Sequence, residues 1–284
     1  MATPLVFATC REYPQLDEDS RLVLAHLPAE TQIAIWNDPT ADWSRYGMII
    51  IRSIWDYHRH ASAFSAWLDE REAEGARLCN PAPMLRWNMN KTYLRDLERQ
   101  GVPVVPTVWL GRGEVSDLRA IVKQRGWQDV VIKPTISASG ENTWRLREHD
   151  ITAFQPRLER LLTTYDLMVQ PFIPEIIDEG EWSFVFFNGQ YSHTVRKQPA
   201  PGEFRSQSEQ GGSVIFDKPT AGMVQQAQNI VRQFNKPHTY ARVDVVNRGG
   251  QLLLMELELI EPELYLRADE EAPARFAQAI MQYR

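Results

Sequence analysis

Two acidic residues that lie two positions apart are the strongest chemical feature of the sequence. Glu256 and Glu258 lie in MELELIEPEL, which alternates acidic and apolar side chains as a β-strand does, so both carboxylates project from one face. Like charges this close need a compensating cation, and carboxylate oxygens suit Mg²⁺ or Mn²⁺. Asp244, in the preceding predicted strand ARVDVV, could supply a third carboxylate. From the pattern alone, the solvent face of an ordinary hairpin is an equal alternative.

The turn between these two strands decides whether Asp244 joins the pair. Because side chains alternate between the faces of a strand, a two-residue turn at Arg248 and Gly249 would put Asp244 and Glu256 on opposite faces. We therefore predict a three- or five-residue loop, or a bulge, around NRGGQ.

Two lysines accompany features that are typical of phosphate sites. Lys133 ends the apolar segment DVVIKP, and the next segment, TISASGENT, includes Ser139 and Gly140 in a loop whose backbone N–H groups could approach phosphates. The loop matches no standard glycine-rich phosphate motif, so a surface lysine is the alternative. Lys91 opens a predicted helix after Asn90, where the helix dipole disfavours a cation unless an anion lies nearby. A solvated lysine is again the alternative.

Three further segments carry candidate ligand contacts. LMVQPFI is either a core strand or a strand that leads to a hinge whose backbone could read an adenine edge. RKQPAPGEFRSQSEQGGS concentrates Lys197 and Arg205 in a long predicted loop, which is typical of a lid but also of a solvated excursion. RSIWDYH places Arg52, Asp56 and Tyr57 past the carboxyl end of a buried strand, where open α/β sheets bind ligands.

The elements that must position these residues change character along the chain. TPLVFATC and GMIIIRSIWDY are apolar strands with a helical segment between them, which predicts an open parallel sheet over residues 1–88. NPAPMLRWNMN is expected to be a proline-broken linker, followed by an amphipathic helix that ends at Gly101. Residues 89–172 predict a small α+β lobe. Residues 173–284 predict hairpins, one with Asn188–Gly189 at its turn, and two closing helices.

Length and composition limit the classes of function. The 284 residues, 43% hydrophobic, can bury a sizeable core, in one large domain or two to three lobes. A net charge of -6 without a basic run argues against extended nucleic-acid binding. We find no secretory leader or membrane span, so we expect a soluble cytoplasmic protein. The two cysteines lack metal or disulfide spacing. Oligomeric state stays open, because helix 222–234 could either bury an interface or pack on the sheet.

The order of these motifs resembles the ATP-grasp superfamily, in its glutathione synthetase and RimK-like region. The likeness covers most of the chain and rests on NKTYLRDL, VIKP, VQPFI with GEWS, the loop VRKQPAPGEFRSQSEQGG, RVDVV and MELELIEP. The N-terminal pieces ATCREYPQLDEDS, IRSIWDYH and NPAPMLRWNMNK are most similar to the branch with the cyclo-ligase of D-cycloserine biosynthesis. The resemblance implies an ATP-grasp fold, α/β and α+β, with an N-terminal open parallel α/β (pre-ATP-grasp) domain.

The resemblance also implies roles for single residues. The nucleotide-binding set would be Lys91, Lys133, Ser139, Gly140, Gln170, Phe172, Ile173 and Glu181, with the lysines at phosphates and Glu181 at ribose. The metal set, for one or two Mg²⁺ or Mn²⁺ ions, would be Asp244, Glu256 and Glu258. The family often has Asn where this chain has Glu258. Lys197 and Arg205 would be catalytic, and Arg52, Asp56 and Tyr57 are our candidates for substrate selection.

The implied activity is ATP-dependent ligation of a carboxylate to an amine through an acyl phosphate. The substrate would be small and amino-acid-like, and an intramolecular cyclisation is one form of this reaction. The loop at about 198–212 would close over the site, because an acyl phosphate hydrolyses when exposed. A small-molecule kinase, or a non-catalytic nucleotide-binding protein on the same fold, is the alternative.

Overall fold

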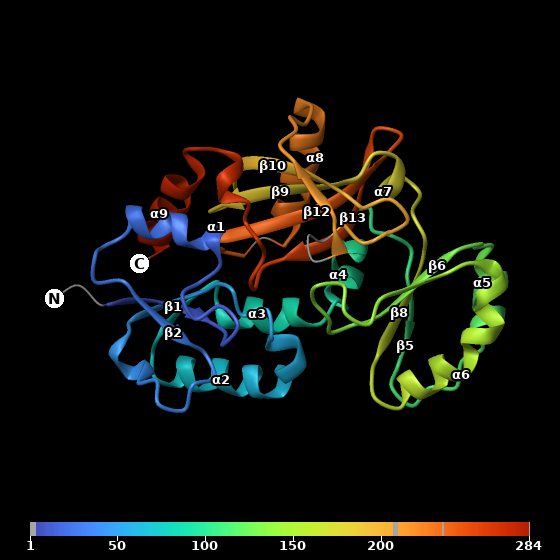
Figure 1. The fold of residues 1–284 in the computed structure, drawn as a ribbon, viewed down its shortest axis with the longest axis horizontal. Helices are drawn as coiled ribbons and strands as arrows, with labels where there is room; N and C mark the ends of the chain where they lie inside the picture. Colours follow the sequence, from blue (N-terminus) through green and yellow to red (C-terminus); the bar gives the residue numbers. More distant parts are fainter. Residues whose placement is uncertain (1–3, 207–209, 235, 284) are drawn as a thin grey trace.

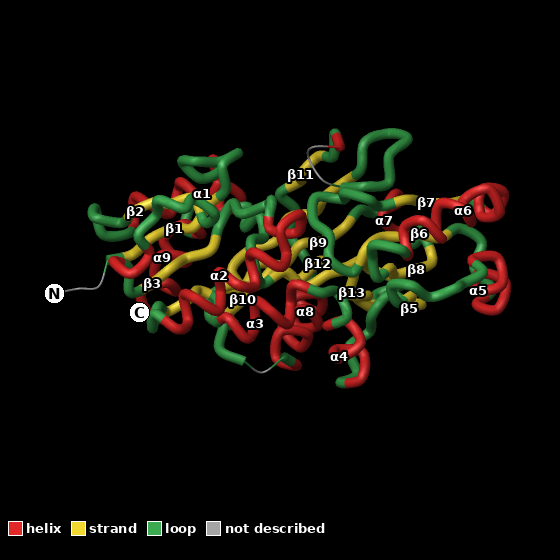
Figure 2. The backbone as a smooth tube through the Cα atoms, turned by 90° about the horizontal axis from the view of Figure 1, so that it is seen from below, coloured by secondary structure: helices red, strands yellow, loops and turns green. Residues whose placement is uncertain are grey.

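Three β-sheets, built from successive parts of the chain, form the frame of the molecule (Figure 1). The structure is a computed structural model that describes residues 4–206, 210–234 and 236–283. Both described ends of the chain lie near the first sheet, and helices α5 (Leu118–Arg125) and α6 (Ile151–Leu162) lie at the opposite end (Figure 2). In the part of the chain that is described, no helix has the length and apolar character needed to cross a membrane.

The first sheet is parallel, as the sequence predicted. Its strand order is β2-β1-β3-β4, for β1 (Leu5–Thr9), β2 (Gln32–Ile35), β3 (Met48–Ile51) and β4 (Arg77–Cys79). Helix α2 (Ala61–Ala73) packs on one face through Phe64 and Trp67, and the C-terminal helix α9 (Ala272–Tyr283) packs on the other through Phe276. Because both faces are covered, all four residues of β3 are buried, which explains the apolar run MIII.

The second sheet is antiparallel and forms the small lobe. Its order is β5-β8-β6-β7, for β5 (Val108–Leu110), β6 (Val130–Pro134), β7 (Trp144–Leu146) and β8 (Leu167–Pro171). Helices α5 (Leu118–Arg125) and α6 (Ile151–Leu162) cover one face, where Val130 and Ile132 join their core. The other face of β6 therefore carries Val131 and Lys133.

The third sheet is antiparallel and is the largest. Its order is β11-β10-β9-β12-β13, for β9 (Glu181–Phe187), β10 (Gln190–Gln198), β11 (Ser213–Ile215), β12 (Tyr240–Arg248) and β13 (Gln251–Glu258). The predicted hairpin turn is present, with Asn188 and Gly189 at φ of 48° and 73°. Helices α3 (Ala82–Met89), α4 (Tyr93–Arg99) and α8 (Ala221–Gln233) pack on one face of this sheet.

Three local expectations were wrong. Helix α4 begins at Tyr93 with Thr92 at its N-cap, so Lys91 precedes the helix and does not open it. The segment expected to be a broken linker forms helix α3, because its prolines lie at the helix start, where a missing N–H costs nothing. The long loop expected over residues 196–213 is shorter, since Arg196 and Lys197 belong to β10 and residues 213–215 form β11. Residues 207–209 of the predicted lid lie outside the described residues.

Shorter helical segments connect these elements. The short α-helices are α1 (Glu18–Arg21) and α7 (Glu175–Asp178), and 3₁₀ turns lie at Leu22–His26, Trp43–Arg45, Tyr57–His60, Glu148–Asp150 and Leu266–Ala268. The packing of α3 and α4 on the third sheet, and of α9 on the first, ties the three predicted domains together. The boundaries at 88/89 and 172/173 stay a prediction.

The hairpin of β12 and β13 contains the predicted change of register, but not at its turn. Arg248 pairs with Gln251 across a two-residue turn, which by itself would put Asp244 opposite Met255. Instead the register shifts between Asp244 and Val245, so that Met255 is an extra residue and Asp244 lies directly opposite Glu256. The bulge therefore brings Asp244 to the face that carries both glutamates.

Candidate active site

One pocket is lined by residues from the second and third sheets and from the segment that follows β3 of the first sheet. It has about 1520 Å³ of empty space, part of it open to solvent. The predicted site residues that line it are Tyr57, Lys91, Lys133, Ser139, Gly140, Gln170, Ile173, Glu181, Lys197, Arg205, Asp244, Glu256 and Glu258. Phe172, Arg52 and Asp56 are not among the described lining residues.

Strand alternation explains why these side chains meet. In β12, Ala241, Val243 and Val245 point into the helix-covered core, so Arg242 and Asp244 face the pocket. The same alternation places Glu181 of β9, and the two glutamates of β13, on the face that the helices leave open. The second and third sheets thus divide their residues between a core face and a pocket face.

Asp244 is buried at the centre of an ion-pair network. It is 2% exposed and accepts hydrogen bonds from the hydroxyl of Ser183 (2.6 Å) and from the guanidinium of Arg242 (Nε 3.0 Å, Nη2 2.9 Å). The Lys197 ammonium lies 3.4 Å from its Oδ2. Burial alone would raise the pKa of Asp244, but Arg242 and Lys197 hold that pKa well below its usual range. Asp244 is therefore ionised at neutral pH.

Glu256 joins the two predicted phosphate lysines. Its Oε1 lies 2.9 Å from the Lys91 ammonium, and its Oε2 lies 3.9 Å from that of Lys133. Lys91 also donates a hydrogen bond to the carbonyl of Ser137 in the small-residue loop. Burial opposes ionisation of Glu256, yet the two ammonium groups lower its pKa overall. One carboxylate of β13 thus orients two lysines from separate segments of the chain.

Glu258 has a different electrostatic environment. Its carboxylate pairs with Arg242, which it shares with Asp244. Burial is the main cause that raises the pKa of Glu258 to about 7, and the charges of Asp244 and Glu256 add to the rise, whereas Arg242 opposes it. This third acid is therefore partly protonated near neutral pH.

The metal assignment stays a prediction. Among the described residues, no group of three or more Asp, Glu, His or Cys side chains is arranged to hold a metal ion. The hard carboxylate oxygens of Asp244, Glu256 and Glu258 share one face and fit a Mg²⁺ donor set in kind, but each is engaged by a cation. A bound metal would have to take these oxygens from their Lys and Arg partners.

Lys197 and Arg205 differ in how firmly they are held. The Lys197 ammonium is buried between Glu181 (3.2 Å) and Asp244 (3.4 Å), and although burial disfavours its charge, these acids raise the pKa of Lys197 overall. Ser206 donates a hydrogen bond to Glu181. Arg205 pairs only with its neighbour Glu203 among the described residues, at 2.7 Å, with its side chain 27% exposed. Arg205 is therefore much less constrained.

The small-residue loop is connected to the first sheet. Ser139 and Gly140 both have positive φ, of 51° and 66°, in the turn that lines the pocket. Glu141, the next residue, accepts from Arg59 (3.0 Å) and lies 2.8 Å from His58 Nε2. These contacts hold the loop of the second sheet against the segment that follows β3.

The residues after β3 that we assigned to substrate selection have different partners. Arg52 is 1% exposed and donates to the backbone carbonyl of Pro262. Asp56 accepts a hydrogen bond from the indole of Trp36 at 2.8 Å. The structure thus gives these two side chains structural contacts, and Tyr57 alone of the three lines the pocket.

Several pocket residues were not in the predicted set. They are chiefly Trp55, Asn88, Tyr93, Arg242, Glu261 and Tyr265. Arg242 could have been found, because it precedes Asp244 by two residues and so shares its strand face. Trp55 lies within the segment RSIWDYH that sequence reasoning had marked, whereas Asn88 and Tyr93 carry no local signal.

Comparison with known proteins identifies the architecture. The profile of the prokaryotic glutathione synthetase ATP-grasp domain matches residues 103–263, and that of the N-terminal domain of the D-cycloserine synthetase DcsG matches residues 5–80. The chain belongs to the ATP-grasp family. It is a C–N bond-forming ligase of this family, whose fold implies the use of ATP with a divalent metal.

Two relatives and one solved structure are similar to this ATP-grasp chain. The cycloserine biosynthesis protein DcsG of Streptomyces lavendulae is 30% identical over 267 residues, 88% of this chain and 87% of that protein. A glutathione synthetase of Parasynechococcus marenigrum is 32% identical over 152 residues, 51% of this chain and 45% of that protein. The crystal structure of D-cycloserine synthetase DcsG superposes with a TM-score of 0.87 at 27% identity, over 99% of this chain and 100% of that one.

Proposed function

We propose that this ATP-grasp ligase uses Mg-ATP to convert the carboxylate of a small amino-acid-like substrate into an acyl phosphate, which an amine then attacks. The observation that carries this proposal is the buried network of ion pairs in the pocket. Lys91 and Lys133 share Glu256, and Lys197 and Arg242 share Asp244. The cations of this network are available to phosphates, and its carboxylates are available to a metal ion.

Nucleotide binding would change the partners of the charged groups in this network. The β- and γ-phosphates would take the ammonium groups of Lys91 and Lys133, which leaves Glu256 free. Asp244, Glu256 and Glu258 would then hold Mg²⁺, which when bound neutralises phosphate charge and orients the transferred group. The pairs keep the buried charges compensated before the nucleotide arrives, because an unpaired buried charge is costly.

The rest of the pocket fits the remainder of a nucleotide. Its apolar lining includes Val131, Ile173 and Met255, which suit the two faces of an adenine ring. We assign the ribose to Glu181 and the phosphates also to the turn at Ser139 and Gly140. Phe172 has its N–H committed to the carbonyl of Asp129 at 2.9 Å, so only its carbonyl is available to the base.

The chemistry would need positioning more than covalent help from side chains. A carboxylate oxygen of the substrate attacks the γ-phosphorus in line, the bond to ADP breaks, and an acyl phosphate forms. The amine nitrogen then attacks the acyl carbon, the bond to phosphate breaks, and the nitrogen loses a proton. We assign the transferred phosphoryl charge to Lys197, which Glu181 and Asp244 hold in place. Arg205 would leave Glu203 to stabilise the oxyanion.

We infer that the amine and the carboxylate can belong to one molecule. The support is similarity over nearly the full chain to a protein named for cycloserine biosynthesis. We further propose three lobes at residues 1–88, 89–172 and 173–284, a cytoplasmic enzyme, and no nucleic-acid partner. Whether the enzyme forms a homo-oligomer is left to measurement.

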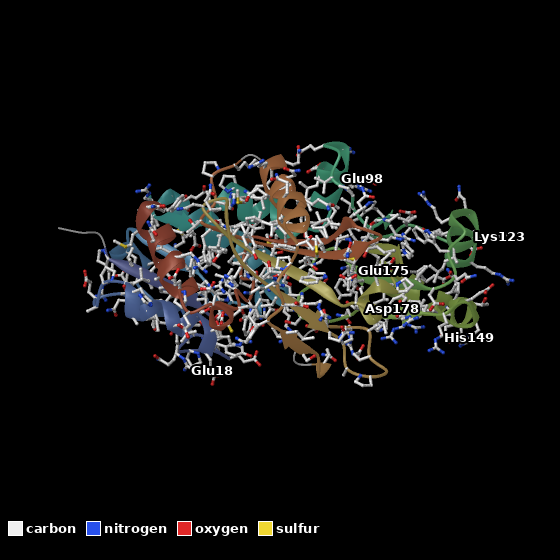
Figure 3. The ribbon with its side chains drawn as sticks, turned by 90° about the horizontal axis from the view of Figure 1, so that it is seen from above. Glu18, Glu98, Lys123, His149, Glu175 and Asp178 are labelled. Atoms are coloured by element: carbon white, nitrogen blue, oxygen red, sulfur yellow. The ribbon has the colours of Figure 1, made fainter. Side chains whose placement is uncertain are left out.

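Calorimetry tests the nucleotide and metal assignments. We expect the wild type to bind ATP only with Mg²⁺, and the double variant Glu256→Ala/Glu258→Ala to lose that binding. The matched control is Glu18→Ala/Glu98→Ala, which removes the same charge from acids that project outward from the surface (Figure 3). Circular dichroism checks that each variant is folded. A wild type that binds no ATP would overturn the proposal.

A chemical trap tests the acyl phosphate. Wild-type enzyme is given Mg-ATP, a panel of D- and L-amino acids as carboxylates, and hydroxylamine as a simple amine. We expect ADP release with formation of a hydroxamate for the accepted carboxylate. ADP release with a phosphorylated alcohol, and no hydroxamate from any carboxylate, would identify a kinase instead.

A further inference from the structure

Among the described residues that line the pocket, one acid differs from the others in lacking an ion pair with Lys or Arg. Six of these described residues are acidic, namely Glu181, Asp244, Glu256, Glu258, Glu261 and Glu263. Five of these carboxylates form an ion pair with Lys or Arg, for example Glu263 with Arg267 at 2.7 Å. Among the described residues, Glu261 has no such partner. It is only 7% exposed, so water cannot solvate it fully.

We propose that Glu261 binds a cationic amino group of the substrate. The inference rests on the proposed function and names the substrate class, a small molecule with a primary ammonium group. A carboxylate that is buried and uncompensated gains more from a cation than one that already has a lysine or arginine beside it. The ammonium has three N–H donors and would supply the missing charge.

The surroundings of Glu261 favour an organic cation. The aromatic side chains of Trp55 and Tyr57 line the same pocket, and their ring faces attract ammonium groups. Burial is the main cause that raises the pKa of Tyr57, and the charge of Glu261 adds to the rise. Trp55 and Tyr57 follow β3, so this part of the pocket is built by the segment after the first sheet rather than by the phosphate lysines.

The backbone at Glu261 is fixed from the first sheet. The Trp55 indole donates to the Glu261 carbonyl at 3.0 Å, and the buried Arg52 donates to the carbonyl of Pro262. Arg52 also lies over the ring of Tyr240, with its Cζ 5.4 Å from the centroid. Two hydrogen bonds therefore hold the segment in place, as a recognition site requires.

The protonation behaviour of Glu261 agrees with a site that is incomplete without a cation. Burial chiefly raises the pKa of Glu261 to about 8, and Glu258 adds to the rise, whereas Lys91 and Arg52 oppose it. An arriving ammonium group would restore the ionised form. Neutral isosteres would not, which gives discrimination between an amine and a hydroxyl.

A pair of isosteric probes tests the inference. D- and L-alaninamide carry an ammonium group, and lactamide carries a hydroxyl in the same place. Ligand-observed NMR titrations are run on the enzyme saturated with Mg²⁺ and a non-hydrolysable ATP analogue. We expect the wild type to prefer one alaninamide over lactamide by about tenfold or more, and Glu261→Gln to lose that preference.

The controls separate this inference from the proposed function. Glu263→Gln removes a pocket acid that Arg267 already neutralises, so the preference should persist, and Glu261→Asp should keep part of it. A preference unchanged in Glu261→Gln, or absent from a wild type that binds the nucleotide, overturns the role of Glu261 alone. Loss of Mg²⁺-dependent nucleotide binding in Glu261→Gln also overturns it, since the residue would then belong to the metal site. Failure of the wild type to bind the nucleotide overturns the proposed function as well.

Discussion

The pocket has two electrostatic regions, one on the strands and one just beyond them. On β12 and β13, Asp244 and Glu256 each contact at least one buried cation, and the pKa of both is lowered although burial opposes this. Beyond β13, Glu261 has no cation, and burial raises its pKa to about 8. The two regions are separated by only a few residues of sequence.

The difference shows that the same residue type can serve opposite purposes in one pocket. Asp244 and Glu256 each contact two cations, keep their charge, and can release those cations to phosphates when the nucleotide binds. Glu258, which contacts only Arg242 among the described residues, has its pKa raised to about 7. The unpaired Glu261 instead takes up a proton below about pH 8, and a cationic substrate can restore its ionised form. Compensation within the protein, rather than burial itself, distinguishes the two regions.

Removal of a shared cation should have the largest effect on the fold. Arg242 contacts both Asp244 and Glu258, so Arg242→Met leaves Asp244 with only Lys197 and Glu258 without a cation. We expect the free energy of unfolding to fall by about 3 to 5 kcal/mol, measured by urea denaturation. Arg99→Met, which breaks an exposed pair with Asp96, should cost less than about 1 kcal/mol. Equal losses in both variants would contradict the comparison.

The phosphate lysines should affect ligand binding more than stability. Lys133 lies beside both Glu256 and the ammonium of Lys91, and burial together with Lys91 lowers its pKa although Glu256 opposes this. Lys133→Met removes that repulsion, so we expect unfolding free energy to change little. Mg-ATP affinity should fall by about 2 to 3 kcal/mol, measured by calorimetry.

A lysine far from the pocket provides the control for this change. Lys123 projects outward from α5 (Figure 3), and Lys123→Met should bind Mg-ATP as the wild type does. If Lys133→Met retained full affinity, the phosphate assignment would be wrong, and Lys133 would serve only to compensate Glu256.

The unpaired Glu261 should lower the free energy of unfolding, and this effect should grow as pH rises. The pKa of Glu261 is about 8 in the folded protein, against 4.5 for an ordinary glutamate, so the folded state binds more protons between these values. Its contribution to stability is therefore present below pH 4.5 and is lost as pH rises toward 8. Glu261→Gln should be more stable than the wild type by about 1 to 2 kcal/mol at pH 8.5, and by much less at pH 5.

The charged and titratable groups that face Glu261 bear on the design of that measurement. They are Glu258, Lys91, Arg52, Tyr57 and Tyr240, and all are present in both proteins. The difference between wild type and variant in urea denaturation at each pH therefore isolates Glu261. A difference that does not change with pH would mean that Glu261 has an ordinary pKa.

The frame of the site could be read from the sequence because its signals are local. The run MIII predicted a strand covered on both faces, and Asn188–Gly189 predicted a hairpin turn. The spacing of Glu256 and Glu258 puts both on one face of the strand. Because a two-residue turn would put Asp244 on the opposite face, the sequence also required a change of register before Asp244 could join them. Each of these follows from backbone geometry over a few residues.

What sequence reasoning missed depends on partners from distant segments. The bulge lies at Met255 rather than at the turn, which no turn residue signals. Arg52 looked like a ligand contact but donates to the carbonyl of Pro262, more than two hundred positions away. Whether a carboxylate is paired or unpaired was also invisible, because the cations reach it from other elements.

The exposed ion pair between the small-residue loop and the segment after β3 should have the smallest effect on the free energy of unfolding. Glu141 joins His58 and Arg59, but its side chain is 41% exposed, and that of Arg59 is 58% exposed. Hydrogen bonding from His58 is the main cause that lowers the pKa of Glu141, so its stabilisation holds above the ordinary glutamate pKa and is lost as pH falls through the lowered value. Since water screens the pair, Glu141→Gln should cost no more than about 1 kcal/mol in urea denaturation at pH 7. A loss as large as that of Arg242→Met would show that contact between the lobes, rather than burial, decides how much an ion pair contributes to the free energy of unfolding.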